Sequence, residues 1–129
     1  MRFKYTILYV QDVTKSLDFY EKAFGLKRKM LHESGVYAEL NTGETTLALC
    51  ARELIRDTDK NPGRPNIKAP TFEISFETDD VPAALNRAKK AGAQGLQDIE
   101  EEPWGQTTSY VFDPDGFVIC LCSPVKGAA

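Results

Sequence analysis

Carboxylate and phenol groups are the side chains of this sequence best suited to bind or transform a small molecule. Glu73, Ser75 and Glu77 alternate in a strand-like segment, so all three should point to the same face. Tyr5 and Tyr9 share a face of the first strand-like segment in the same way. A carboxylate next to a phenol could bind a cationic or hydrogen-bonding group, and Glu73 could alternatively act as a general acid or base.

Three more aromatic residues could hold a flat organic ligand. Tyr37 and Tyr110 fall in later strand-like segments, and Trp104 is the only tryptophan, in a Pro-Trp-Gly loop. Aromatic side chains commonly line concave ligand sites. Each residue also has a purely structural interpretation, in which the tyrosine hydroxyls reach solvent and the tryptophan packs against a sheet edge. The acidic run before Trp104, residues 100–102, is expected to be solvated surface.

The histidine and the cysteines give weaker signals. His32 is the only histidine, and we expect it on a strand with its ring partly exposed. Cys120 and Cys122 should face the same way on one strand, and Cys50 could lie in the equivalent strand of the first half. Structural zinc normally takes four ligands, so we interpret the thiols as buried, reduced residues of packed strands.

These residues are carried by two copies of one pattern. Residues 5–26 and 73–94 each run from a strand through an acidic turn into a helix that stops at a glycine. Asp12 or Thr14 could cap the first helix, and Gly25 and Gly92 supply the stops. The first helix has one apolar stripe with the spacing of a buried helix face, formed by Val13, Leu17, Tyr20 and Phe24.

Short strands are expected before and after each helix, which predicts the α+β class with two tandem βαβββ modules. They are predicted near residues 4–10, 27–33, 36–40, 45–51, 71–78, 94–98, 107–112 and 117–122. Module one should cover residues 1–51 and module two residues 70–129 of a single domain. The stretch between them, residues 52–69, contains prolines and glycine and is predicted to be an irregular linker.

Composition excludes several classes of function. The chain has 129 residues, 42% of them hydrophobic, which is enough for one compact domain. Its net charge of −3 gives no basic surface for nucleic acid or an anionic membrane. No apolar run approaches the ~20 residues of a membrane span, and the N-terminus enters a strand instead of a signal segment. We therefore expect a cytoplasmic protein.

Two motifs point to a family. The first helix opens with D-V-x-x-S-L-x-F-Y from Asp12, and the last hairpin reads Y-V-F-D-P-D-G-F-V from Tyr110. With two βαβββ modules around them, these motifs resemble the vicinal oxygen chelate superfamily, which includes glyoxalase I, extradiol dioxygenases and bleomycin-resistance proteins. The resemblance covers essentially the whole chain. It implies that the sheets curl into an open cup, with the helices on the outer face.

The resemblance also implies where a metal ion would bind. In the enzymes of this family, the ligands come from the first and last strands of each module. The matching positions in this sequence are Tyr5, Ala48, Glu73 and Cys120. Only Glu73 is a good ligand for a hard divalent ion, and one carboxylate cannot hold such an ion against water. We therefore expect no metal and no other cofactor.

Three hypotheses follow. The first is a binding protein of the antibiotic-resistance type, which sequesters a planar or cationic compound in a metal-free cup through Tyr5, Tyr9, Tyr37, Glu73, Trp104 and Tyr110. The alternative is a metal-dependent lyase, isomerase or dioxygenase that uses another ligand set, or Glu73 as an acid or base. The third is an interaction module that binds no ligand. The resemblance also implies a homodimer, for which unpaired sheet edges give a physical reason.

Overall fold

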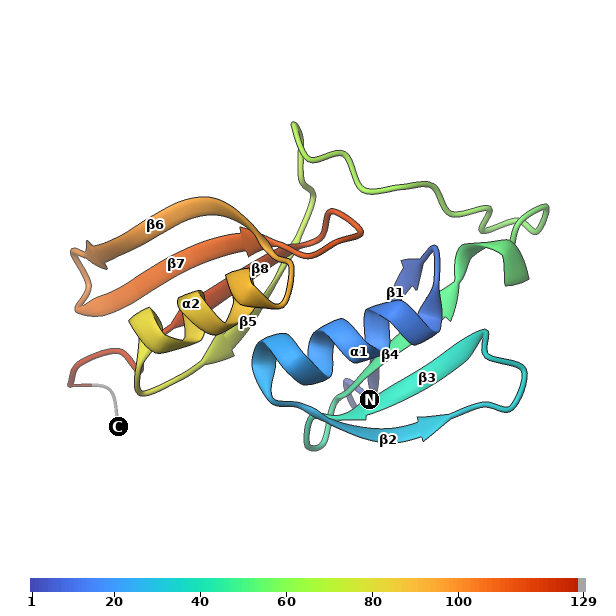
Figure 1. Cartoon of the computed structure of the whole chain (residues 1–129), viewed down its shortest axis with the longest axis horizontal. Coiled ribbons are helices and arrows are strands. Elements are labelled where there is room, and N and C mark those ends of the chain that lie inside the picture. Colours follow the sequence, from blue (N-terminus) through green and yellow to red (C-terminus); the bar gives the residue numbers. More distant parts are fainter. Residues whose placement is uncertain (128–129) are drawn as a thin grey trace. The chain divides into compact units, whose positions relative to one another are not determined.

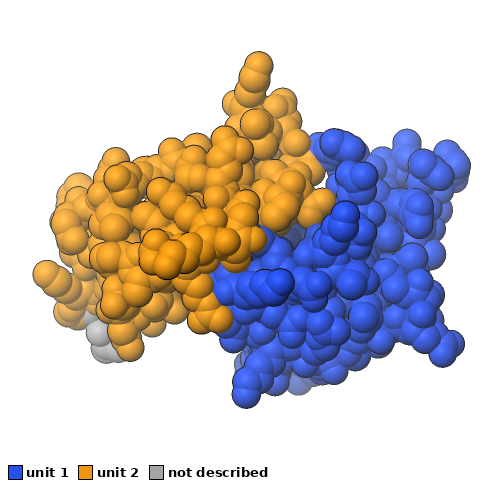
Figure 2. Space-filling model, viewed as in Figure 1, with its two compact units in different colours: residues 1–64 blue, residues 65–129 orange. Residues whose placement is uncertain are grey.

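The computed structural model describes residues 1–127 of the chain. It contains two four-stranded sheets with the same topology (Figure 1). The chain divides into two compact units, residues 1–64 and 65–129 (Figure 2). Each unit has one sheet and one α-helix in the order β-α-β-β-β. The predicted α+β class and the repeated module are therefore confirmed, whereas the grouping of both modules into a single domain stays a prediction.

The first unit pairs its first strand with its last. Its strand order is β1-β4-β3-β2, in which β1 and β4 are parallel and the other pairs antiparallel. A short 3-10 helix, η1 (Arg52–Leu54), follows the sheet. The elements of the sheet and its helix are β1 (Tyr5–Val10), α1 (Val13–Phe24), β2 (Lys27–Leu31), β3 (Tyr37–Asn41) and β4 (Thr46–Ala51).

The second unit repeats this topology. Its strand order is β5-β8-β7-β6, again with a parallel pair between the first and last strands. The linker predicted to be irregular, residues 52–69, begins with the short helix η1, and no helix or strand follows η1 before this unit's sheet. The elements are β5 (Glu73–Glu77), α2 (Val81–Lys90), β6 (Gln94–Glu102), β7 (Gln106–Phe112) and β8 (Val118–Cys122).

Equivalent aspartates start both helices. The carboxylate of Asp12 accepts a hydrogen bond from the backbone N–H of Lys15 (3.1 Å), and that of Asp80 accepts from Ala83 (3.0 Å). Each bond satisfies one of the N–H groups that a helix start leaves without an intrahelical partner. Asp12, and not Thr14, is therefore the cap of α1. Helix α1 ends at Gly25, whose φ of 67° lies in the left-handed region that glycine adopts without strain.

Each helix covers one face of its own sheet. Leu8 of β1 and Leu49 of β4 are fully buried on the helix side of the first sheet, as is Leu17 of α1. In the second unit, Leu85 of α2 and Ile119 of β8 are buried in the same way. Because neighbouring residues of a strand point to opposite faces, the other face of each sheet carries the side chains in between. We call this second face the open face.

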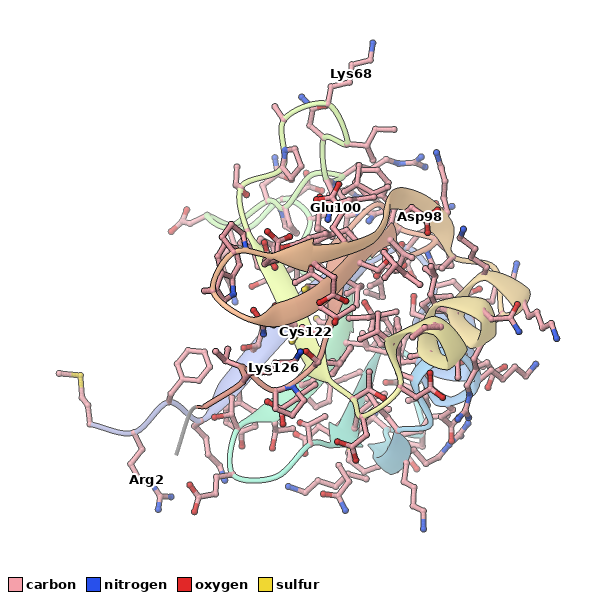
Figure 3. The ribbon with its side chains drawn as sticks, turned by 90° about the vertical axis from the view of Figure 1, so that its left-hand side faces the viewer. Arg2, Lys68, Asp98, Glu100, Cys122 and Lys126 are labelled. Carbon is pink, nitrogen blue, oxygen red and sulfur yellow. The ribbon has the colours of Figure 1, made fainter. Side chains whose placement is uncertain are left out.

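Several predicted boundaries need correction. Strand β6 was expected to end near Asp98 but continues through the acidic run to Glu102, so that Asp98 and Glu100 are exposed strand residues (Figure 3). The extension is stabilised by threonine hydroxyls of β7, because Thr107 and Thr108 donate to the carboxylates of Glu101 (2.7 Å) and Glu102 (2.8 Å).

The strand predicted to contain His32 ends earlier than expected. Strand β2 stops at Leu31, and His32 lies exposed in the following turn. Its Nδ1 atom accepts a hydrogen bond from the backbone N–H of Ser34 (3.1 Å). The backbone N–H of His32 still donates across the hairpin to the carbonyl of Tyr37 (2.9 Å), so the turn begins directly after this last paired residue.

Candidate ligand-binding site

The open face of the second sheet brings together side chains from three strands. The strand register places Ser75 of β5, Cys120 of β8 and Tyr110 of β7 in one row. Glu73 of β5 lies beside Val118 in the next row. The alternation predicted for β5 is thus confirmed, and its polar residues share a face with Tyr110.

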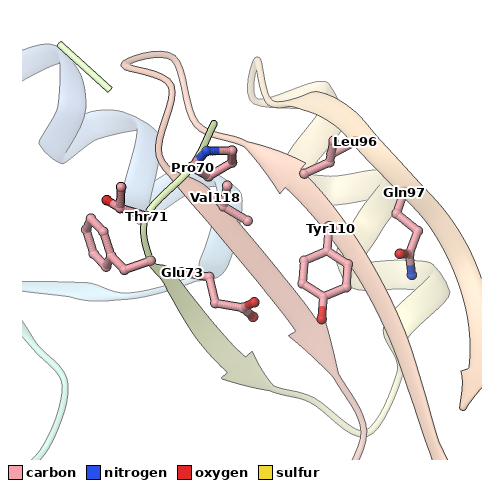
Figure 4. A pocket seen from close by; sticks show the side chains of 8 residues that line it. Pro70, Thr71, Glu73, Leu96, Gln97, Tyr110 and Val118 are labelled. Carbon is pink, nitrogen blue, oxygen red and sulfur yellow. The ribbon is translucent and has the colours of Figure 1, made fainter. Parts of the chain in front are cut away.

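A pocket of about 670 Å³ lies on this unit (Figure 4). Its volume is within the range of small-molecule sites. Two of the predicted ligand-binding residues, Glu73 and Tyr110, belong to its lining and point into the same space (Figure 4). The full lining consists of Pro70, Thr71, Phe72, Glu73, Leu96, Gln97, Tyr110 and Val118.

The pocket has one acidic group and an apolar wall. Phe72 and Leu96 are about half exposed, so their apolar surface is available to a ligand, and Phe72 also contacts the ring of Phe117 at 5.8 Å between centroids. The hydroxyl of Ser75 donates to the carboxylate of Glu73 (3.1 Å) and fixes its orientation. No lysine or arginine is among the lining residues. A ligand with a positive charge and a flat apolar part would match this lining.

Tyr110 presents a neutral phenol to the pocket. Burial, followed by the Cys120 thiol and the carboxylates of Glu73 and Glu102, raises the pKa of Tyr110 to about 12. The phenol therefore keeps its proton at neutral pH and can both donate and accept a hydrogen bond. Burial also raises the pKa of Cys122, with Cys120 as the next cause.

The cysteines are free and buried, as predicted. Burial raises the pKa of the Cys50 thiol, which Lys60 lowers to a smaller extent. Because a thiolate and not a thiol is the reactive form, a raised pKa makes Cys50 and Cys122 poor nucleophiles.

The open face of the first sheet carries the other predicted tyrosines. Tyr9, Cys50 and Tyr37 lie in one row across β1, β4 and β3, and Tyr5 lies beside Thr46. The predicted residues thus form two groups, one on each unit. Tyr5 and Glu73 belong to different units. The predicted pairing of the Tyr5 phenol with the Glu73 carboxylate therefore stays a prediction.

Glu39 is a carboxylate on the open face of the first sheet that the sequence analysis did not identify. The hydroxyl of Tyr37 donates to its carboxylate (2.7 Å), and burial together with this bond raises the pKa of Tyr37. The register places Glu39 directly beside Ala48 on the open face. Alternation could have revealed it, since Ala38 and Leu40 on either side are fully buried on the helix face.

Trp104 lies in the turn between β6 and β7 and does not line the pocket. Its indole is 57% exposed, and its ring nitrogen donates to the side-chain oxygen of Gln106 (2.7 Å). The structure therefore places it apart from Glu73 and Tyr110 within the same unit. Its role in ligand binding stays a prediction.

The residues at the family's metal positions do not fit a hard divalent ion. Ala48 has no donor atom, Cys120 offers a buried thiol and Tyr5 a phenol, so Glu73 is the one carboxylate of the set. Within residues 1–127, no three histidine, cysteine, aspartate or glutamate side chains gather as a group that could hold a metal.

The sequence matches a protein-family model over most of its length. Residues 2–121 match the Glyoxalase/Bleomycin resistance protein/Dioxygenase superfamily. The chain belongs to this superfamily, as its motifs suggested. Within the described residues, no helix is both long enough and apolar enough to cross a membrane.

Individual relatives carry different names. The chain is 31% identical over 124 residues to a lactoylglutathione lyase of Neisseria meningitidis serogroup B, covering 92% of this chain and 88% of that protein. A glyoxalase-related enzyme from Fulvimarina pelagi has a TM-score of 0.81 at 20% identity, covering 95% and 88% of the two chains. A protein of unknown function from Agrobacterium tumefaciens has a TM-score of 0.77 at 27% identity, covering 97% and 95%.

Proposed function

We propose that this chain binds a planar or cationic organic molecule without a metal ion, as a binding protein of the antibiotic-resistance type. The observation that supports this best is the pocket of the second unit, where Glu73 and Tyr110 face an apolar wall and no basic residue. The carboxylate would hold a positive charge, and Phe72 and Leu96 would cover a flat apolar surface. Cytoplasmic location and a homodimer are part of the proposal.

Replacing Glu73 tests the charge requirement. We expect Glu73→Gln to weaken the binding of proflavine, a planar organic cation, about tenfold, because the amide keeps the size of the side chain and removes its charge. Isothermal titration calorimetry measures the affinity. Glu77→Gln is the matched control, since Glu77 is exposed on the same face of β5 outside the pocket lining, and it should change affinity less than twofold.

The neutral analogue acridone completes this test. It should bind equally to the original protein and to Glu73→Gln, because the change removes a charge that acridone does not use. If Glu73→Gln lowers the affinity for proflavine and for acridone equally, the result would contradict a role for the carboxylate in holding a cation. Absence of binding for both ligands in the original protein would remove the support for this pocket.

A metal-dependent lyase is the second candidate, favoured by the relative named lactoylglutathione lyase. The donor set at Tyr5, Ala48, Glu73 and Cys120 opposes it. We expect untagged protein incubated with nickel, zinc or iron(II) and desalted to retain less than about a tenth of an equivalent of metal. Elemental analysis measures the metal, and an assay with methylglyoxal and glutathione measures the lyase activity.

The two hypotheses give opposite results in this experiment. Near one equivalent of retained metal together with lyase activity would favour the enzyme and refute the metal-free proposal. Glu73→Gln then separates a ligand role from an acid or base role, because loss of the metal identifies a ligand, whereas loss of activity with the metal retained identifies an acid or base.

A further inference from the structure

Three tyrosines and one carboxylate gather on the open face of the first sheet. Tyr5 and Tyr9 come from β1, and Tyr37 and Glu39 from β3, which lie on either side of β4. We call these four residues the tyrosine face. The side chains of β4 between them are small, namely Thr46, Ala48 and Cys50.

This arrangement sets the distance between the two strands that carry the aromatic residues. Neighbouring strands lie about 4.8 Å apart, so β1 and β3 are separated by roughly 10 Å across β4. The small residues of β4 are buried, whereas Tyr5 is 47% exposed. Aromatic rings on the strands that flank these small residues could contact a compact ligand group from two sides.

The charge of Glu39 is only partly compensated. Its side chain is 15% exposed and accepts the Tyr37 hydroxyl at 2.7 Å. The nearest cation is the ammonium of Lys29, at 3.8 Å and with a side chain that is half exposed. A pair at this distance and exposure is weak, so the carboxylate can still attract another cation.

Ammonium groups of the chain already approach this face from separate segments. Besides Lys29 at Glu39, the ammonium of Lys4 lies 5.7 Å from the centre of the Tyr5 ring. Each of these two contacts places a positive charge next to a ring or the carboxylate of the tyrosine face.

We propose that the tyrosine face binds a quaternary, trimethylated ammonium group of a small organic cation. This inference rests on the proposed function and names the chemical class of its ligand. A quaternary ammonium has no N–H groups that need hydrogen-bond acceptors, and its charge is attracted by the faces of aromatic rings within about 6 Å. Glu39 supplies the opposite charge, and Tyr37 both contributes a ring and orients the carboxylate.

Choline and 3,3-dimethylbutan-1-ol form a matched pair of probes, because they have the same shape and differ in charge. We expect choline to shift the amide signals of β3 and β4 in NMR titrations of ¹⁵N-labelled protein. The neutral alcohol should bind at least tenfold more weakly. Equal affinity for the two probes would overturn the proposal, as would shifts that avoid both strands.

Variants of the carboxylate and of its lysine test the role of charge. Glu39→Gln should weaken choline binding about tenfold and leave the alcohol unchanged. Lys29→Met should strengthen choline binding about threefold, because a competing ammonium is removed. Glu44→Gln is the control, since Glu44 is exposed in the turn between β3 and β4. A Glu39→Gln protein that binds choline as well as Glu44→Gln would refute the role of the carboxylate.

Variants of Tyr37 test the role of the ring. Tyr37→Phe keeps the ring and should bind choline within threefold of the original protein, whereas Tyr37→Leu should lose at least fivefold. The amide spectra show whether each variant is folded. If choline does not bind but proflavine still binds at Glu73, this inference alone is refuted. If neither choline nor proflavine binds, the proposed function is refuted as well.

Discussion

At Tyr110, burial and the neighbouring Cys120 thiol keep the phenol protonated well above its ordinary range. A pKa that is higher in the folded than in the unfolded state means that the folded state binds the proton more tightly. The resulting stabilisation is fully present below about pH 10, the ordinary pKa of tyrosine, and is lost as the pH rises through about 12. The raised pKa of Tyr37 acts in the same direction.

We therefore expect the free energy of unfolding to fall between pH 9 and pH 12, and to fall less in Tyr110→Phe. Urea unfolding at pH 8 and at pH 11 measures the difference, and phenylalanine keeps the ring while removing the titrating group. If both proteins lose the same free energy between the two pH values, the Tyr110 phenol does not carry the effect.

At the scale of elements, the two helices depend on equivalent caps. We expect Asp12→Ala and Asp80→Ala each to lower the free energy of unfolding by about 1 kcal/mol, because each change removes the acceptor for an N–H group of the first turn. Chemical denaturation measures the loss. Thr14→Ala should cost clearly less, since Asp12 is the cap of α1; a cost for Thr14→Ala as large as that for Asp12→Ala would contradict this assignment.

The elements were largely predictable from sequence, because their signals are local. Alternation, the apolar stripe of α1 and the turn residues correctly identified all eight strands and both helices. The errors lie where contacts with residues on other strands determine the ends of an element. Strand β6 continues through three glutamates because threonine hydroxyls of β7 bind two of them, and no local pattern encodes those partners.

The candidate site was less predictable, because it depends on register between strands. Sequence pattern identified Glu73 and Tyr110 but could not show that Phe72 and Leu96 complete a pocket with them. It also missed Glu39, whose importance comes from its position beside Ala48 on the neighbouring strand. Alternation shows which face a residue occupies, whereas pairing shows which residues it meets.

At the scale of the whole molecule, the duplication relates the two open faces. Glu39 lies beside Ala48, and Tyr110 lies beside Cys120, so the two residues occupy equivalent places next to two of the family's metal positions. One unit has a carboxylate in this place and the other a phenol. The repeated fold therefore carries two different polar groups in equivalent places.

The pairing of the first strand of each unit with its last has a consequence for synthesis of the chain. Strand β1 is made first, but within residues 1–127 it pairs only with β4, which is the last strand of the first unit along the chain. Until β4 leaves the ribosome, β1 exposes unpaired backbone groups, and the first sheet cannot be completed. The same delay recurs between β5 and β8, so the chain passes through two successive periods in which an unfinished sheet is open to wrong partners.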